Sequence, residues 1–139
     1  MAKTITREKN INLVKDILDT ANKEGWVLTL DRDEGALFYA PKIISDKTEH
    51  FQITDEYAVY LDKRSNPKGV MIECYGVNFI KHHPEFEAIT ERVFSEDNEN
   101  EIETVNPKTN KSEDVIIFKS LLEKTLLSDV IRDDLIVSR

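Results

Sequence analysis

The sequence is poor in cysteine and glycine. Its 139 residues contain one cysteine, Cys74, and four glycines. A single cysteine excludes an intramolecular disulfide, and small secreted domains usually contain several, so we expect a reducing, cytoplasmic location. The sequence contains neither a P-loop nor a dinucleotide-binding glycine loop. Phosphate-cradling loops of these two types are therefore excluded.

Long apolar runs are also missing. No stretch of the sequence approaches the ~20 consecutive apolar residues of a membrane-spanning helix. Residues 1–8 become polar before any apolar run develops, which argues against a secretory signal peptide. We therefore expect a protein without a membrane segment.

What the chain does contain is enough apolar material for a folded domain. Hydrophobic residues make up 40% of the chain and charged residues 33%. That composition is typical of a globular protein with a well-solvated surface. A chain of this length fits one domain, here residues 1–139, and buries about two-thirds of its unfolded surface.

The charge of the chain is strongly acidic, with a net value of −8. Phosphate backbones repel such a chain unless basic residues gather on one face. Lys63, Arg64 and Lys68 surround one predicted turn, and Lys81 stands alone. This scatter argues against nucleic-acid binding. A basic protein partner suits the charge better, and solubility alone is the simpler explanation.

Three segments have the apolar spacing of helices. They are residues 6–24, residues 84–94 and the stretch that begins at Ser112. Gly25 is typical of the residue just after a helix, and Ser112 of a helix N-cap. In the last segment, residues 115–118 also fit a short strand.

Five shorter segments have strand character: residues 26–30, 36–40, 50–54, 57–62 and 70–75. The first two are joined by an acidic turn that ends in glycine, as in a β-hairpin. In the third, alternation predicts that Phe51 and Ile53 point inward. In the fifth, an apolar composition predicts a central strand that buries Cys74 as an unreactive thiol.

These elements predict an α+β fold. We expect an antiparallel sheet of four or five strands within about residues 26–80, flanked by an N-terminal helix and two C-terminal helices. Residues 95–104 contain five acids and no base, which predicts a solvated loop.

The last helix has an unusually wide apolar stripe. Its side chains indicate either burial on two sides within the chain or packing on another chain. Together with the tyrosines described below, this width predicts a homodimer. The stripe consists of Val115, Phe118, Leu121, Leu122, Leu126, Leu127, Val130, Ile131, Leu135 and Ile136.

Two segments resemble a family of small bacterial proteins of unknown function. Residues 28–40 are similar to its opening, in which a strand, an acidic turn and Ala-Leu-Tyr follow one another. Residues 59–73 are similar to its second half, where a strand ends in aspartate, here Asp62, and a turn leads into a Gly-Ile-Glu-Ile strand. Here the turn is longer and contains Pro67.

This resemblance covers about one third of the chain. The family has no established activity, but some members lie beside small relatives of toxin-like ribonucleases. The resemblance therefore implies an inhibitory or antitoxin-like role.

The segment Lys81-His82-His83-Pro84-Glu85 contains the clearest candidates for metal-binding or catalytic side chains. Two histidines and a carboxylate are ligands for a divalent transition metal. Adjacent histidines point in different directions, however, and the spacing matches no helix-based zinc motif. Histidines that form hydrogen bonds near a helix start explain the segment as well, so we predict no cofactor.

Two carboxylates are candidates for acid–base chemistry. Asp62 and Glu73 lie on the two strands of one predicted hairpin, where they could face each other as a proton-transfer pair. Such a pair is costly without a cation, which Lys63 or Lys68 would supply.

The tyrosines of the strands are candidates for a recognition surface. Tyr39, Tyr57, Tyr60 and Tyr75 lie in or beside predicted strands. Alternation places Tyr57 and Tyr60 on opposite faces of the sheet, which predicts at least one exposed tyrosine row. Tyrosine is favoured at protein interfaces, and core packing is the alternative for most of these side chains.

The sequence therefore favours a non-catalytic interaction protein that binds a protein partner, in particular a basic one. The alternative is a metal-dependent or acid–base hydrolase that uses His82, His83, Glu85 and nearby carboxylates.

Overall fold

Six strands and four α-helices are present in the computed structural model, which describes residues 7–42, 47–94 and 101–137. The elements in chain order are α1 (Arg7–Glu24), β1 (Val27–Asp31), β2 (Ala36–Ala40), β3 (Glu49–Gln52), β4 (Tyr57–Leu61), β5 (Pro67–Ile72), a π-helical turn η1 (Tyr75–Phe79), α2 (Ile80–His82), α3 (Phe86–Val93), β6 (Ile102–Val105) and α4 (Glu113–Val137). No helix among these residues is long and apolar enough to cross a membrane.

The strands form one antiparallel sheet in the order β3-β4-β5-β2-β1-β6. The predicted hairpin of β1 and β2 is confirmed, and its turn ends at Gly35, whose φ of 70° suits a residue without a Cβ. The prediction that residues 70–75 supply a central strand is also confirmed, because β5 lies between β4 and β2.

The sheet has six strands rather than the predicted four or five. The sixth, β6, consists of residues 102–105, and its first three residues lie in the segment predicted to be a solvated loop. It pairs with the edge of β1, where Oγ1 of Thr29 lies 3.1 Å from Oγ1 of Thr104 and Arg32 forms an ion pair with Glu103. Three of its four residues, Ile102, Thr104 and Val105, are β-branched, which favours a strand at this edge of the sheet despite the acidic surroundings.

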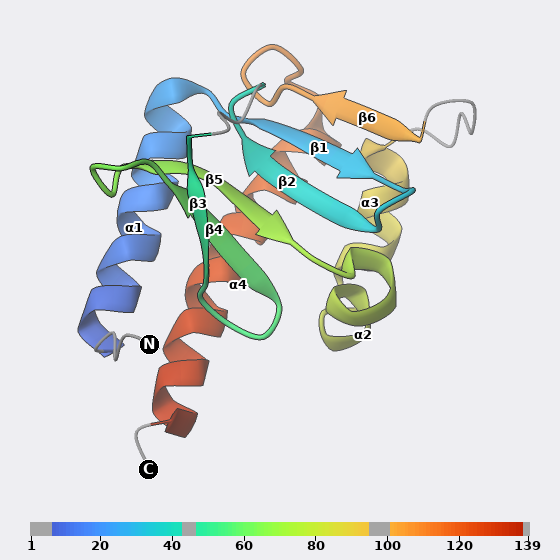
Figure 1. Ribbon diagram of the computed structural model, residues 1–139. Coiled ribbons are helices and arrows are strands. Elements are labelled where there is room, and N and C mark those ends of the chain that lie inside the picture. The colour runs from blue at the N-terminus through green and yellow to red at the C-terminus, as the bar shows by residue number, and fades with distance from the viewer. Residues whose placement is uncertain (1–6, 43–46, 95–100, 138–139) are drawn as a thin grey trace.

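All four helices lie on one side of the sheet, as Figure 1 shows. The helix α4 crosses behind the strands and contacts both α1 and α3. Ser112 is its N-cap, since the N–H of Val115 donates to the Ser112 hydroxyl at 3.3 Å. The alternative of a strand at residues 115–118 is wrong, because these residues are helical.

The apolar stripe of α4 is buried within the chain. Its central ridge is at most 2% exposed, and its flanks are partly buried against α1 and α3. Burial on two sides therefore explains its width without a second chain. The ridge consists of Val115, Phe118, Leu122, Leu126 and Val130, flanked by Leu121, Leu127 and Ile131; the side chains of Leu135 and Ile136 lie outside the described part.

Two side chains are more exposed than predicted. Phe51 faces the same side of the sheet as the buried Val59, in agreement with the predicted alternation, but it is 37% exposed because β3 is an edge strand. Cys74 was expected in the core but is exposed. The strand β5 ends at Ile72, and Cys74 then adopts a left-handed conformation, with a φ of 49°, that starts η1. Its side chain therefore does not continue the inward alternation of β5.

Candidate functional site

The two adjacent histidines differ in burial because the chain turns at His83, but they do not point apart as predicted, since both rings contact the carboxylate of Glu56. The helix α2 ends at His82, and His83 leaves the helical region with φ −135° and ψ 69°. The following residue, Pro84, disfavours a helical conformation at His83. As a result the His82 side chain is 60% exposed, whereas the His83 side chain is 7% exposed.

His83 lies between two carboxylates. Its Nε2 is 3.0 Å from Oε1 of Glu56 and 3.0 Å from Oδ2 of Asp129. Three separate parts of the chain thus meet at one point: the turn between β3 and β4, the α2–α3 linker and α4. We call Glu56, His83 and Asp129 the carboxylate–histidine cluster.

The turn that holds Glu56 is fixed by its neighbour Thr54. The hydroxyl of Thr54 accepts hydrogen bonds from the N–H groups of Glu56 and Tyr57, at 3.1 and 3.3 Å. The N–H of Ile53 donates to the carbonyl of Tyr57 at 3.0 Å and closes the hairpin. This tight turn directs the Glu56 side chain beneath the sheet, where it is 9% exposed.

Each carboxylate also has a contact on its other oxygen. His82 Nδ1 lies 2.9 Å from Oε2 of Glu56. Nη2 of Arg132, one turn further along α4, donates to Oδ1 of Asp129 at 3.0 Å. These outer contacts orient both carboxylates, so that the remaining oxygens, Oε1 and Oδ2, point at His83.

The imidazole of His83 is also packed against aromatic rings. Its centroid lies 4.4 Å from that of Phe79 and 6.4 Å from that of Phe86. Water is thereby kept from one side of the ring, and electrostatic interactions within the cluster are strengthened.

Burial and proximity shift the pKa values of the two carboxylates in opposite directions. Burial and the neighbouring Glu56 act to raise the pKa of Asp129, His83 and Arg132 act to lower it, and the net result is a pKa of about 6. Burial also acts to raise the pKa of Glu56, but hydrogen bonds with His83 and His82 outweigh burial and lower that pKa. The cluster therefore favours one shared positive species, a proton or a cation, between the two carboxylates.

A cation fits the positions of the ligand atoms. One oxygen from each carboxylate and Nε2 of His83 all lie within 4.8 Å of one another, and all three residues are buried. Carboxylate oxygen and imidazole nitrogen are both metal ligands.

The sequence-based candidates are only partly brought together. His82 and His83 both contact Glu56, but Glu85 is exposed at the N-cap of α3 and is not part of the cluster. The pairing of Asp62 with Glu73 is wrong. Leu61 faces Pro67 and Tyr57 faces Ile72, so Asp62 and Glu73 follow opposite ends of the β4–β5 hairpin.

Sequence reasoning missed Glu56 and Asp129. Glu56 looked like an ordinary turn residue beside Asp55. Asp129 carried a usable signal, because it follows Leu126 by three residues and precedes Val130, which places it on the buried side of α4. A carboxylate at a core position needs a partner.

Three of the four tyrosine candidates are buried rather than exposed. Tyr39, Tyr57 and Tyr75 are at most 2% exposed. Their hydroxyls are hydrogen-bonded inside the protein, to Glu123 at 2.8 Å, to the carbonyl of Leu126 at 2.7 Å and to Thr90 at 2.7 Å. These tyrosines stabilise the core, so the expected exposed row does not form from them.

Tyr60 lies on the other face of the sheet, which no helix covers. Alternation along β2 places Leu37 and Tyr39 towards the helices, so Phe38 points away from them, and its neighbour in the register is Met71. The hydroxyl of Tyr60 donates to the sulfur of Met71 at 3.5 Å. We call the surface formed by Thr29, Phe38, Tyr60, Met71 and Thr104 the open sheet face.

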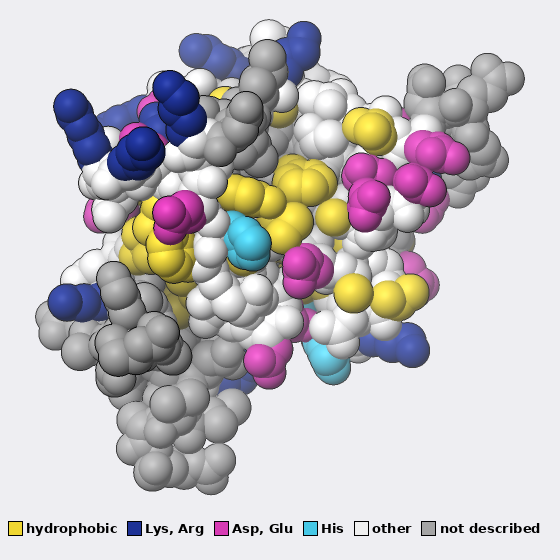
Figure 2. Space-filling model, in the orientation of Figure 1, with side chains coloured by type: hydrophobic (Ala, Val, Ile, Leu, Met, Phe, Trp, Pro, Cys, Tyr) yellow, Lys and Arg dark blue, Asp and Glu magenta, His cyan; other side chains and the backbone are white. Residues whose placement is uncertain are grey.

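Figure 2 shows hydrophobic side chains gathered over the strands on this face. Lysine and arginine side chains collect near the turn between β4 and β5, and acidic side chains collect at the opposite end, near the turn between β1 and β2. Lys63 and Arg64 belong to the basic end. The acidic end includes Asp31, Asp33, Glu34, Glu73 and Glu101.

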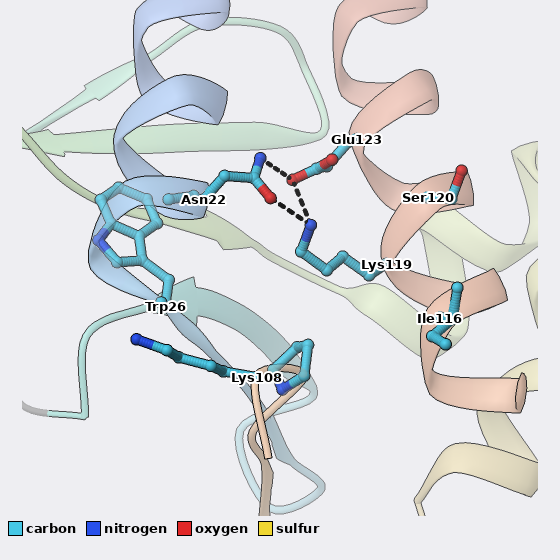
Figure 3. A pocket seen from close by; sticks show the side chains of 10 residues that line it. Asn22, Trp26, Lys108, Ile116, Lys119, Ser120 and Glu123 are labelled. Atoms are coloured by element: carbon cyan, nitrogen blue, oxygen red, sulfur yellow. Dashed lines mark hydrogen bonds and ion pairs between the residues drawn. The ribbon is translucent and has the colours of Figure 1, made fainter. Parts of the chain in front are cut away.

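A cavity of about 480 Å³ lies between α1, α4 and the loop that precedes α4 (Figure 3). Its polar side chains are bonded to one another: Asn22 donates to Glu123 at 3.0 Å, and Lys119 contacts both residues. Because these groups already have partners, the cavity offers a ligand few unsatisfied polar atoms.

Comparison with known proteins gave no relative from which a role can be transferred. No protein-family model, no curated protein and no solved structure matches the chain.

Proposed function

We propose that this protein is a non-catalytic interaction module that binds a basic protein partner over its open sheet face. The antitoxin-like or inhibitory part of this role comes from the resemblance of residues 28–40 and 59–73 to the small bacterial family. The binding itself is proposed from the surface of the sheet.

The uncovered apolar strip is the observation that carries the proposal. Phe38, Tyr60 and Met71 are half-buried and form neighbouring positions on three central strands. Ile102 of β6 adds a side chain on the same face that is 59% exposed. Aromatic residues and methionine are enriched at protein interfaces, and such a surface gains free energy when a partner removes it from water.

Charge is the reason for choosing a basic partner. The net charge of the chain is −8, and acidic side chains lie at one end of the open sheet face. Complementary charge speeds association and disfavours acidic competitors. Because exposed charges are screened by salt, the complex should weaken as ionic strength rises.

A second copy of the chain is the competing occupant. Turned end for end, it would place Lys63 and Arg64 over the acidic turn between β1 and β2. Two-fold dimers use such self-complementary surfaces. The experiment below therefore includes the oligomeric state.

The hydrolase alternative has less support. Of its five candidate residues, only His82 and His83 lie together, because both contact Glu56. The other three, Glu85, Asp62 and Glu73, lie elsewhere. A reaction at His83 would also require the substrate to reach a residue that is 6% exposed.

The test compares wild-type protein with the double variant Phe38→Thr/Met71→Thr, immobilised and incubated with native cell extract at low salt. Threonine retains strand propensity, and circular dichroism checks that the variant is folded. The control Ile116→Thr removes an exposed apolar side chain from α4, on the other side of the molecule. Size-exclusion chromatography of all three proteins gives the oligomeric state.

We expect wild-type protein and the Ile116→Thr control to bind one basic protein in stoichiometric amounts, released as salt rises, while the double variant does not bind it. Equal capture by the double variant, or capture of no basic protein, would overturn the proposal. A wild-type dimer that the double variant converts to a monomer would instead identify a second copy as the occupant.

A further inference from the structure

Oδ2 of Asp129 lacks a hydrogen bond although it is completely buried. The residue is 2% exposed, and no described group satisfies this oxygen. His83 Nε2 is equally distant from Oδ2 and from Oε1 of Glu56, at 3.0 Å, but it carries at most one proton. The hydrogen bond at Nε2 is made with Glu56, so Oδ2 of Asp129 is left as a buried oxygen that points into the cluster without a hydrogen bond. Such an unsatisfied buried polar atom has a substantial cost in free energy.

We propose that the carboxylate–histidine cluster binds one divalent transition-metal ion of the Zn²⁺ type, through Oε1 of Glu56, Nε2 of His83 and Oδ2 of Asp129. The ion replaces the Nε2 proton and supplies the missing partner of Oδ2. This proposal is independent of the open sheet face and goes beyond partner binding.

The distances fit such an ion after a small adjustment. Zinc binds imidazole nitrogen and carboxylate oxygen at about 2.0–2.2 Å, which separates tetrahedral ligand atoms by about 3.4 Å. The two separations measured at His83 are 3.0 Å. Side-chain rotations that move each carboxylate outward by a few tenths of an ångström are therefore sufficient. A water molecule completes the tetrahedron.

The outer contacts also match those of a metal site. Ligands of bound metals are usually held by further hydrogen bonds that fix their orientation. His82 Nδ1 contacts the second oxygen of Glu56 at 2.9 Å, and Arg132 contacts the second oxygen of Asp129 at 3.0 Å. Both ligand carboxylates are thereby oriented in advance.

Charge and ligand type determine which ion fits. Two carboxylates and a neutral imidazole balance a charge of +2. The imidazole nitrogen favours zinc and its neighbours over magnesium and calcium, which prefer oxygen alone. The side chain of His82 is 60% exposed and contacts the same carboxylate as His83, so only one side chain separates Glu56 from solvent there.

The test measures Zn²⁺ binding to chelator-treated full-length protein by isothermal titration calorimetry, with Mg²⁺ as the comparison ion. We expect one Zn²⁺ per chain and a rise in the melting temperature. Glu56→Gln and Asp129→Asn each remove a ligand oxygen with little change in volume. Each should raise the Kd by more than about 100-fold, since loss of an outer contact alone costs about 10–100-fold.

Two histidine variants distinguish the site from incidental surface binding. His82→Gln removes an outer contact and should weaken Zn²⁺ binding by about 10-fold. His50→Gln removes a histidine on β3, away from the cluster, and should leave the Kd unchanged.

Circular dichroism shows whether each variant is folded, and the two ligand variants serve as checks on each other. Failure of folded wild-type protein to bind Zn²⁺ would overturn the proposal. So would unchanged affinity in a folded Glu56→Gln or Asp129→Asn variant, or a loss of affinity in His50→Gln as large as in the ligand variants.

Discussion

The hydroxyl of Tyr39 donates a 2.8 Å hydrogen bond to Oε2 of Glu123, 84 residues further along the chain. The same carboxylate accepts a hydrogen bond from Asn22 of α1 at 3.0 Å. One partly exposed carboxylate thus connects the centre of the sheet with both long helices. Burial and the adjacent Glu123 raise the pKa of Tyr39 far above its usual value, so its hydroxyl remains a donor throughout the stable pH range.

Tyr39→Phe removes this donor while it preserves the ring. We expect a loss of about 1.5 kcal/mol in the free energy of unfolding, because the bond involves a charged acceptor that keeps two other partners. Urea denaturation followed by circular dichroism measures it. Tyr60→Phe is the matched control, since that hydroxyl donates only to a sulfur, and it should cost less than about 0.5 kcal/mol. Equal losses in the two variants would contradict the role assigned to Tyr39.

Phe118→Ala should be far more destabilising. Phe118 is fully buried, and its ring centroid lies 5.7 Å from those of both Phe86 and Phe94. Loss of the ring leaves a cavity between α3 and α4, at an expected cost of about 3–5 kcal/mol. Ile117→Ala, at the preceding position of the helix and 45% exposed, should cost less than about 1 kcal/mol. Similar urea midpoints for both variants would contradict this packing.

Asp62 should make stability depend on pH. Hydrogen bonds from the N–H groups of Asn66 and Arg64 hold the pKa of Asp62 below its usual value in the folded protein. A carboxyl group with a lowered folded pKa stabilises the protein above its unfolded pKa of about 3.9, and this contribution disappears as pH falls through the folded value.

Asp62→Ala should therefore be less stable than wild type at pH 7, and the difference should shrink in acid. Urea midpoints measured from neutral to acidic pH check this, with Asp55→Ala, an exposed residue in another turn, as the control. A difference between wild type and Asp62→Ala that stays constant with pH would show that the charge of Asp62 does not stabilise the turn.

Cys74 should react readily in the folded protein. Its side chain is exposed at the start of η1, so a thiol reagent such as Ellman's reagent does not need the protein to unfold first. We expect one equivalent to react in native buffer nearly as fast as in urea. Reaction that requires urea would indicate a buried thiol, as the apolar composition of residues 70–75 had predicted.

Features set by local pattern were predictable from the sequence. The alternation in residues 26–30 predicts that Trp26, Leu28 and Leu30 share one side of a strand, and all three are buried. The spacing from Val115 to Val130 identified the buried ridge of α4. Where a short segment has little local signal, prediction failed. β6 has four residues in an acidic region, and its pairing partner β1 decides its conformation.

The carboxylate–histidine cluster was only partly predictable. His83 was recognisable as a candidate metal ligand, but no sequence pattern near it indicates contact with Glu56 and Asp129. These residues meet only when the helices pack beneath the sheet. Cys74 illustrates a related limit. Its left-handed backbone follows from the geometry of the β5–η1 connection, not from the residue type.

The pairing of β1 with β6 has a consequence for the kinetics of folding. Thr29 faces Thr104, so this edge of the sheet closes only after most of the chain has been brought together, whereas the β1–β2 and β4–β5 hairpins join residues close in sequence. Closing a long loop costs more entropy than closing a short one, and such non-local contacts slow folding. We therefore expect the two hairpins to form early and β6 to dock late, in the last step that completes the sheet.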